Sequence, residues 1–147
     1  ARTDYDRACD VFDYVSKLAC DSGEVLLLGD EPLRSAFCFA RDILIIARWW
    51  ACDSEERAET ALRHVPAQLP ALEEEVSFVV RSTTLTMLDS ARSGAEPRSQ
   101  HRVQIPTGKY SVTSENYELP GVFQFLIHRF MRQGLRSSAR TRLGAPV

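Results

Sequence analysis

The longest apolar segment of the chain, at residues 43–52, carries hydrophobic side chains at both odd and even positions, with Arg48 as its one charged residue. Successive side chains of a strand point to opposite faces of a sheet. A strand that is apolar on both faces is typical of an internal strand, covered on both sides. The pattern therefore predicts a central strand at about residues 43–51.

Shorter strand-like runs occur on both sides of this segment, separated by turn-forming residues. A hairpin is predicted around the Gly-containing turn at residues 21–23, and a short connection at residues 41–42 precedes the central strand. The run at residues 123–131 is too short for its periodicity to distinguish a strand from a helix. The other predicted strands are residues 14–20, 24–30, 35–40, 73–82, 84–90, 102–106 and 108–119.

Two short helices are predicted as well. The second lies at about residues 54–65, where a capping pair, Asp53-Ser54, precedes two glutamates that favour the positive end of the helix dipole. Pro66 ends it. The first begins after Thr3, a candidate N-cap, and spacings of three and four indicate an apolar face formed by Tyr5, Cys9, Phe12 and Val15.

A chain of 147 residues fits one domain, and we assign residues 1–132 to it. Many short strands and one or two helices predict a mostly β (α+β) fold, a bent antiparallel sheet or a β-sandwich with the helices packed on it. The Ser/Gly/Pro-rich segment at residues 90–100 is predicted to be a flexible loop. Residues 133–147, which are rich in Gly, Ser and Arg, are predicted to be a flexible basic tail.

The net charge of −2 conceals an asymmetry between the two halves of the chain. Residues 1–76 contain 16 acidic and 8 basic residues, whereas residues 77–147 contain 4 acidic and 10 basic residues. The balances are therefore −8 and +6. Such asymmetry is typical of an acidic docking face, a basic tail or both, unless folding interleaves the halves and cancels the field.

Neither a membrane span nor an export signal is visible in the sequence. The longest apolar run is shorter than the roughly 18 residues that a spanning helix needs, and no Lys/Arg-flanked apolar run opens the chain. We therefore expect a cytoplasmic protein. Its cysteines form no Cys-x-x-Cys pair, and no histidine stands near them at ligand spacing, so we expect no metal site and four reduced thiols: Cys9, Cys20, Cys38 and Cys52.

No motif for catalysis or for a cofactor is present. The Gly-x-Ser-x-Gly elbow and the phosphate-binding glycine loops are missing, and His64, His101 and His128 stand far apart in the sequence. We therefore expect no catalytic residue, no metal and no cofactor, and a binding protein rather than an enzyme. Because catalytic groups can meet in space, a small Cys/His-dependent enzyme stays open as an alternative.

A nucleic-acid-associated module that uses the basic C-terminal half is the other alternative. Its arginines include Arg132, the last residue of the domain, and Arg136, Arg140 and Arg142 of the tail. The interleaved aromatic residues on which single-stranded nucleic acids stack are absent there. We therefore expect no direct nucleic-acid binding.

Six local motifs, in this order, resemble the immunity protein 21 family of bacterial polymorphic toxin systems. The resemblance covers roughly residues 4–131. Each motif is weak alone, but their order and spacing are compatible with the family. The motifs are DYDRAC (4–9), LLLGDEP (26–32), RWWACDSEE (48–56), LTMLDSA (85–91), IPTGKYSV (105–112) and LIHRF (126–130).

The resemblance implies a small cytoplasmic protein, encoded beside a secreted toxin, that binds and neutralises this cognate toxin and performs no catalysis. Toxins that act on nucleic acids are commonly basic, so we expect the toxin-binding surface to lie in the acidic first half. Trp50 is included because it shares the face of Arg48 and is expected near the surface or in a cation–π contact. The predicted toxin-binding residues are Asp30, Glu31, Glu55, Trp50 and Asp6.

Overall fold

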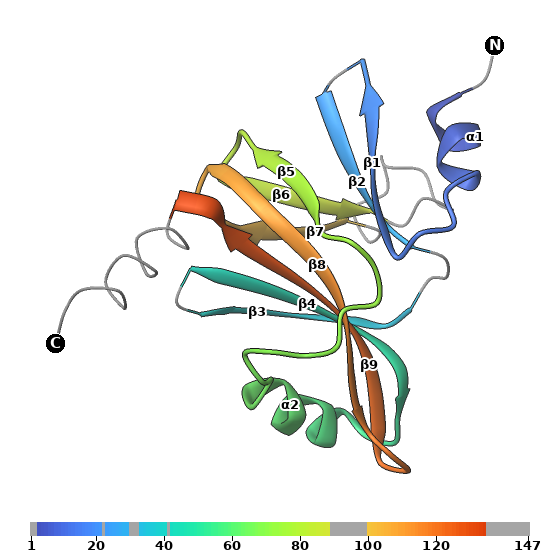
Figure 1. Cartoon of the computed structure of the whole chain (residues 1–147), viewed down its shortest axis with the longest axis vertical. Helices are drawn as coiled ribbons and strands as arrows, with labels where there is room; N and C mark the ends of the chain where they lie inside the picture. Colours follow the sequence, from blue (N-terminus) through green and yellow to red (C-terminus); the bar gives the residue numbers. More distant parts are fainter. Residues whose placement is uncertain (1–2, 22, 30–32, 41, 89–99, 135–147) are drawn as a thin grey trace, which may run out of the picture.

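A twisted five-stranded antiparallel sheet forms the centre of the structure, a computed structural model that describes residues 3–21, 23–29, 33–40, 42–88 and 100–134 (Figure 1). Two hairpins and two short helices surround this sheet. The predicted class, a mostly β fold with antiparallel sheets and two short helices, is confirmed. Along the sheet the strands are β3 (Ser35–Ala40), β4 (Ile43–Cys52), β9 (Phe123–Arg132), β8 (Gly108–Leu119) and β5 (Val76–Val80).

The predicted strands are found, with differences mainly at their ends. β8 has the bounds that the sequence predicts, and the ambiguous run at residues 123–131 is the strand β9. β4 is internal as predicted, while β9 takes the middle of the sheet between β4 and β8. The two hairpins are β1 (Val15–Cys20) with β2 (Gly23–Leu28) and β6 (Thr84–Leu88) with β7 (Gln100–Gln104).

The large sheet carries an apolar layer on each face, because odd and even residues of its strands point in opposite directions. Leu44 and Ile46 of β4 pack in one layer, which the residues of both hairpins complete. Ala47, from the same strand, packs in the other layer beneath the second helix, α2 (Glu55–Arg63). Figure 1 shows the β1–β2 hairpin and α2 at opposite ends of the long axis of the molecule.

Helix α2 follows the sequence prediction closely. The Ser54 side chain accepts a hydrogen bond from the backbone N–H of Arg57 and caps the helix. Ala58 and Ala61 are its buried residues, and their small side chains allow a close approach to the sheet. The helix ends at Arg63, before Pro66, and the Tyr117 hydroxyl of β8 donates to the carbonyl oxygen of Ala61 at 3.1 Å.

The first helix differs from its prediction. Helix α1 (Asp4–Cys9) buries none of its residues, and Phe12, expected on an apolar helix face, lies beyond the helix with 83% of its surface exposed. Val15, expected on the same face, is instead the buried first residue of β1. The periodicity failed here because it continued by coincidence across the boundary between a helix and a strand.

A β-bulge changes the faces of β4 near its end. Trp49 pairs with Phe125 and Ala51 pairs with Gln124, so Trp50 is an extra residue in the ladder. An extra residue shifts the alternation by one position. Cys52, expected on the face of Leu44, packs in the α2 layer for this reason.

A buried ion pair fastens the α2 layer to the sheet. Arg129 of β9 and Glu115 of β8 have side chains that are each 7% exposed, and the closest bond, from Nε to Oε2, measures 2.9 Å. A second nitrogen, Nη2, donates to the carbonyl oxygen of Pro66 at 2.7 Å. Since Pro66 follows α2, Arg129 joins two central strands to the segment that leaves the helix.

Glu115→Gln should lower the free energy of unfolding by about 3–5 kcal/mol, because it leaves the Arg129 guanidinium buried without its counter-charge. Urea denaturation measures the loss. Glu59→Gln is the control: its exposed pair with Arg63, at 3.9 Å, should be worth no more than about 1 kcal/mol. Equal stabilities of the two variants would show that the buried pair does not fasten this layer.

Candidate functional site

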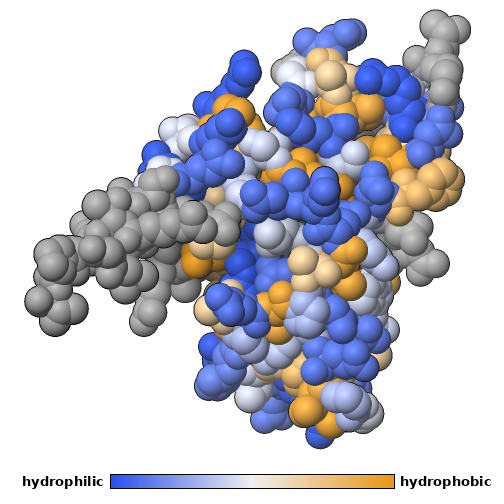
Figure 2. Space-filling view, in the orientation of Figure 1, coloured by the Kyte–Doolittle hydropathy of each residue, from blue (hydrophilic) through white to orange (hydrophobic). Residues whose placement is uncertain are grey.

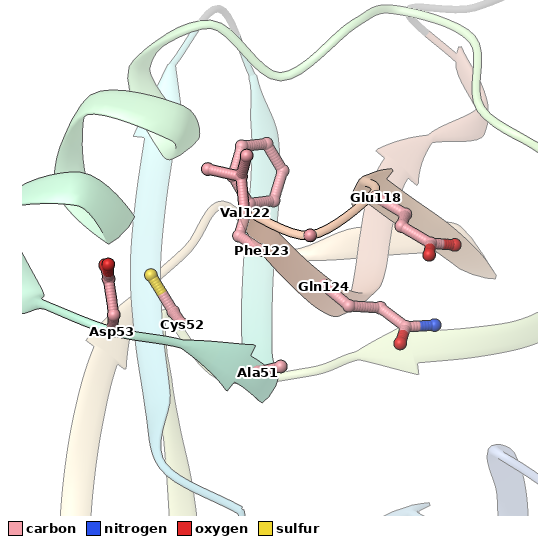
Figure 3. A pocket seen from close by; sticks show the side chains of 8 residues that line it. Ala51, Cys52, Asp53, Glu118, Val122, Phe123 and Gln124 are labelled. Atoms are coloured by element: carbon pink, nitrogen blue, oxygen red, sulfur yellow. The ribbon is translucent and has the colours of Figure 1, made fainter.

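A surface hollow lies where β4 ends, α2 begins and the β8–β9 turn passes beside them (Figure 3). Val122 and Phe123 form an apolar wall that two adjoining parts of the hollow share. The part toward β4 has a volume of about 580 Å³ and the part toward α2 about 470 Å³. The other lining residues are Ala51, Cys52, Asp53, Ser54, Glu56, Arg57, Thr60, Ala61, Glu118, Leu119, Gly121 and Gln124. We call this site the α2 hollow.

The turn between β8 and β9 shapes the α2 hollow. Gly121 has φ of 75°, a conformation that side-chain-bearing residues rarely adopt. The backbone N–H of Val122 donates to the carbonyl oxygen of Leu119 at 2.9 Å and closes the turn. As a result Leu119 is 50% exposed at the edge of the hollow.

Three carboxylates line the α2 hollow, and a neighbouring cation neutralises one of them. Asp53 pairs with Arg57 at 2.9 Å. In Figure 3 the carboxylates of Asp53 and Glu118 lie on opposite sides of the apolar wall. Glu118 accepts a hydrogen bond from Asn116 at 3.3 Å, and Glu56 forms no ion pair with any residue that the structure describes. The hollow could therefore accept the aliphatic stem and the cationic end of a lysine or arginine side chain.

Glu55, one of the predicted binding residues, lies on the first turn of α2. It pairs with Arg34 at 3.2 Å, and both side chains are well exposed. The same Arg34 guanidinium lies over the ring of Trp49, 4.5 Å from its centroid. Trp50 was expected near the surface or in a cation–π contact, but among the described residues such a contact is formed by Trp49, with Arg34.

Trp50 is half-buried at the β4 bulge, and its ring meets that of Tyr14 edge-on with centroids 5.9 Å apart. Arg48 is 4% exposed and points into the protein, where it donates to the carbonyl oxygens of Leu28 and Gly29 at 2.7 and 3.2 Å. Arg48 therefore has a structural role, because it binds the end of β2 to the large sheet.

Asp6 belongs to the capping box of α1. Its Oδ2 accepts hydrogen bonds from the backbone nitrogen and the hydroxyl of Thr3, at 2.8 and 2.7 Å. These bonds stabilise the carboxylate and lower the pKa of Asp6. Two exposed rings accompany this helix: Tyr5 is 55% exposed and Phe12 is 83% exposed.

The structure separates two of the predicted binding residues. Asp6 and Glu55 belong to helices at opposite ends of the long axis (Figure 1). Asp30 and Glu31 lie outside the described residues. Phe12, Glu118 and Leu119 were not predicted. The turn-forming sequence after Glu118 is the signal that could have indicated the last two, whereas the helical pattern concealed Phe12.

The buried residue His128 has a hydrogen-bond partner at one of its two ring nitrogens, Nδ1, whereas Nε2 has none among the described residues. His128 is fully buried in β9, and its Nδ1 lies 3.2 Å from the hydroxyl of Ser114 on β8. Burial, together with the nearby charge of Arg48, lowers the pKa of His128 to about 3. The imidazole is therefore neutral near pH 7, and no solvent or substrate reaches it. Its position suits a packing role.

The remaining candidate groups are dispersed over the structure. His64 is exposed at the end of α2, and His101 stacks on Phe37 with centroids 4.4 Å apart. All four cysteines are free thiols, and Cys52 lines the α2 hollow, where no histidine does. In the part of the chain that the structure describes, no three His, Cys, Asp or Glu side chains are grouped to hold a metal ion.

Comparison with known proteins gives one family. The family model described as Immunity protein 21 matches residues 1–119, a range that includes both helices and the strands β1 to β8. No curated protein and no solved structure matches the chain. Among the described residues, no helix has the length and apolar character needed to cross a membrane.

The buried state of His128 should make the stability of the protein depend on pH. Between pH 6.5 and about 3 the unfolded chain binds a proton at this residue that the folded chain excludes, so the free energy of unfolding falls as the pH is lowered. The slope approaches about 1.4 kcal/mol per pH unit. Urea denaturation from pH 7 to 4 should show a smaller slope for His128→Gln than for the unchanged protein.

His64→Gln is the matched control, because His64 is exposed. It should retain the slope of the unchanged protein. If His128→Gln retained it as well, other groups would govern the acid sensitivity and the proton would have access to His128 in the folded state.

Proposed function

The chain belongs to the immunity protein 21 family, and from this premise we propose that it neutralises a cognate toxin by binding the toxin protein directly, without catalysis. The main observation in support of this proposal is the family match over residues 1–119. An inhibitor of this kind needs a rigid scaffold and an exposed patch complementary to its partner. The sheet and its two apolar layers provide the scaffold, and the charged hollow and the acidic helix α1 provide candidate patches.

The distribution of titratable groups agrees with binding better than with catalysis. The one histidine with a strongly shifted pKa is sealed between the strands, and the hollow at the surface contains a thiol without a histidine. Catalytic acids and bases need a pKa suited to their task and access to the substrate. These observations favour the toxin-binding function over a Cys/His-dependent enzyme.

Carboxylates are the proposed contact groups for a basic toxin. Charges at the rim of an interface act mainly on the association rate and its salt dependence. Among the residues that the sequence singled out, Asp6 lies on α1 and Glu55 on α2, while the ring of Trp50 meets that of Tyr14, in the segment that follows α1. The proposed place of action is the cytoplasm of a bacterium with a polymorphic toxin system, and four free thiols suit that reducing compartment.

Co-expression with the toxin domain encoded beside this chain should rescue cells from the toxin, and the two proteins should co-purify. A titration of the purified toxin activity then separates the mechanisms. A binding inhibitor abolishes the activity at one immunity protein per toxin, because each complex removes one toxin molecule. The association rate should also fall as the salt concentration rises.

The proposal would be contradicted if far less than one chain per toxin abolished the toxin activity and mass spectrometry showed a changed toxin mass. Such a result would indicate an enzyme that modifies the toxin. Rescue without any complex would also contradict direct binding.

A further inference from the structure

The segment formed by α1 and the residues on either side of it, residues 3–13, displays the most exposed large apolar side chains of the described chain. Phe12 is 83% exposed and Tyr5 is 55% exposed, ahead of Leu119 at 50%. We call this segment the α1 end. Figure 2 shows apolar residues over it, bordered by hydrophilic ones. Exposed aromatic side chains that become buried on binding are typical of the central contacts of protein interfaces.

The α1 end is well supported although its helix is short. A helix of this length is unstable alone. The capping box of Thr3 and Asp6 closes its beginning, Arg7 pairs with Asp4 at 3.0 Å, and the backbone N–H of Val11 donates to Ala8 at 3.1 Å beyond its end.

The chain after Phe12 is fixed to the protein interior. The carboxylate of Glu73 accepts the backbone N–H groups of Tyr14 and Val15, at 3.2 and 2.7 Å. A Cβ atom at Gly29 would lie 3.0 Å from backbone atoms of Asp13 and Tyr14, so a side chain there would push this backbone away by a few tenths of an ångström. Phe12 is therefore an exposed ring on an ordered support, which lowers the entropy cost of binding through it.

The charge of the α1 end indicates the chemistry of its partner. Four aspartates and one arginine give residues 3–13 a net charge of −3. Asp13 is exposed, and its carboxylate forms no hydrogen bond or ion pair with any residue in the described ranges. A second copy of this chain, or an anionic lipid surface, would bring like charges together. The complementary partner is a basic protein surface with an apolar recess.

Resting on the proposed toxin-binding function, we propose that the α1 end is the face that the toxin covers, with Phe12 in an apolar recess of the toxin and the aspartates against its basic side chains. The α2 hollow is less suited to this role. No large apolar side chain there is as exposed as Phe12, and two carboxylates at or beside the hollow, Asp53 and Glu55, are already paired with Arg57 and Arg34.

Phe12→Ala should weaken binding of the toxin domain encoded beside this chain by about 30-fold or more, the loss expected for a central aromatic contact. Its thermal stability should stay unchanged, because Phe12 is so exposed. Leu119→Ala, at the α2 hollow, and Phe39→Ala, on β3, are the controls and should change the affinity by no more than about twofold. Calorimetric titration measures the affinity.

Charge reversal tests the electrostatic part. Asp13→Lys and Glu56→Lys form a matched pair, since both carboxylates are exposed and neither has an ion-pair partner in the described structure. Asp13→Lys should slow association about threefold or more and flatten its salt dependence, while Glu56→Lys should leave both nearly unchanged.

Three results would overturn the inference. If the unchanged protein did not bind the toxin, the proposed function would fail with it. If the unchanged protein bound, but Leu119→Ala and Glu56→Lys were the weakened variants, the toxin would occupy the α2 hollow and only the inference would fail. If sedimentation showed a dimer that Phe12→Ala converts to a monomer, the α1 end would be covered by a second copy of the chain.

Discussion

Two buried arginines hold the covering layers of this protein to its sheet. Arg129 reaches from β9 to Glu115 and to the backbone of Pro66, on the face that α2 covers. Arg48 reaches from β4 to the end of β2, on the face that the hairpins cover. A buried guanidinium is costly unless its hydrogen bonds are satisfied. Each covering segment supplies carbonyl oxygens to one of them, and this requirement fixes where the segment lies.

These buried contacts also fix the position of the surface segment that carries Phe12. Arg48 holds Gly29, Gly29 lies against the backbone of Asp13 and Tyr14, and Glu73 holds the beginning of β1. This series of contacts ends at Asp13, the residue that follows Phe12 in the chain. A side chain with almost no contacts of its own can thus have a defined position, because the backbone that carries it is fastened from the interior.

The fold was largely predictable because alternation and turn residues are local signals. β8, the internal strand β4 and the capped helix α2 follow from them. The bulge at Trp50 was not predictable, because it depends on how β4 meets β9, and it reversed the face of Cys52. The exposure of Phe12 was missed because the helical spacing continued into β1. In both cases a periodic pattern was extended too far along the chain. Strand pairing with a distant segment interrupts the pattern at that point, and the local sequence does not show this.

The sequence could not show which of the candidate binding residues lie close together, because the distribution of charge along a chain does not give its distribution in space. Part of the acidic excess of the first half lies on the two helices, which stand at opposite ends of the long axis (Figure 1). At the α2 end, Arg34 and Arg57 neutralise their neighbours. At the α1 end, Arg7 pairs with Asp4, and the exposed carboxylate of Asp13 has no ion-pair partner among the described residues. The sequence predicts an acidic surface, and local ion pairing decides which part of it can attract a partner.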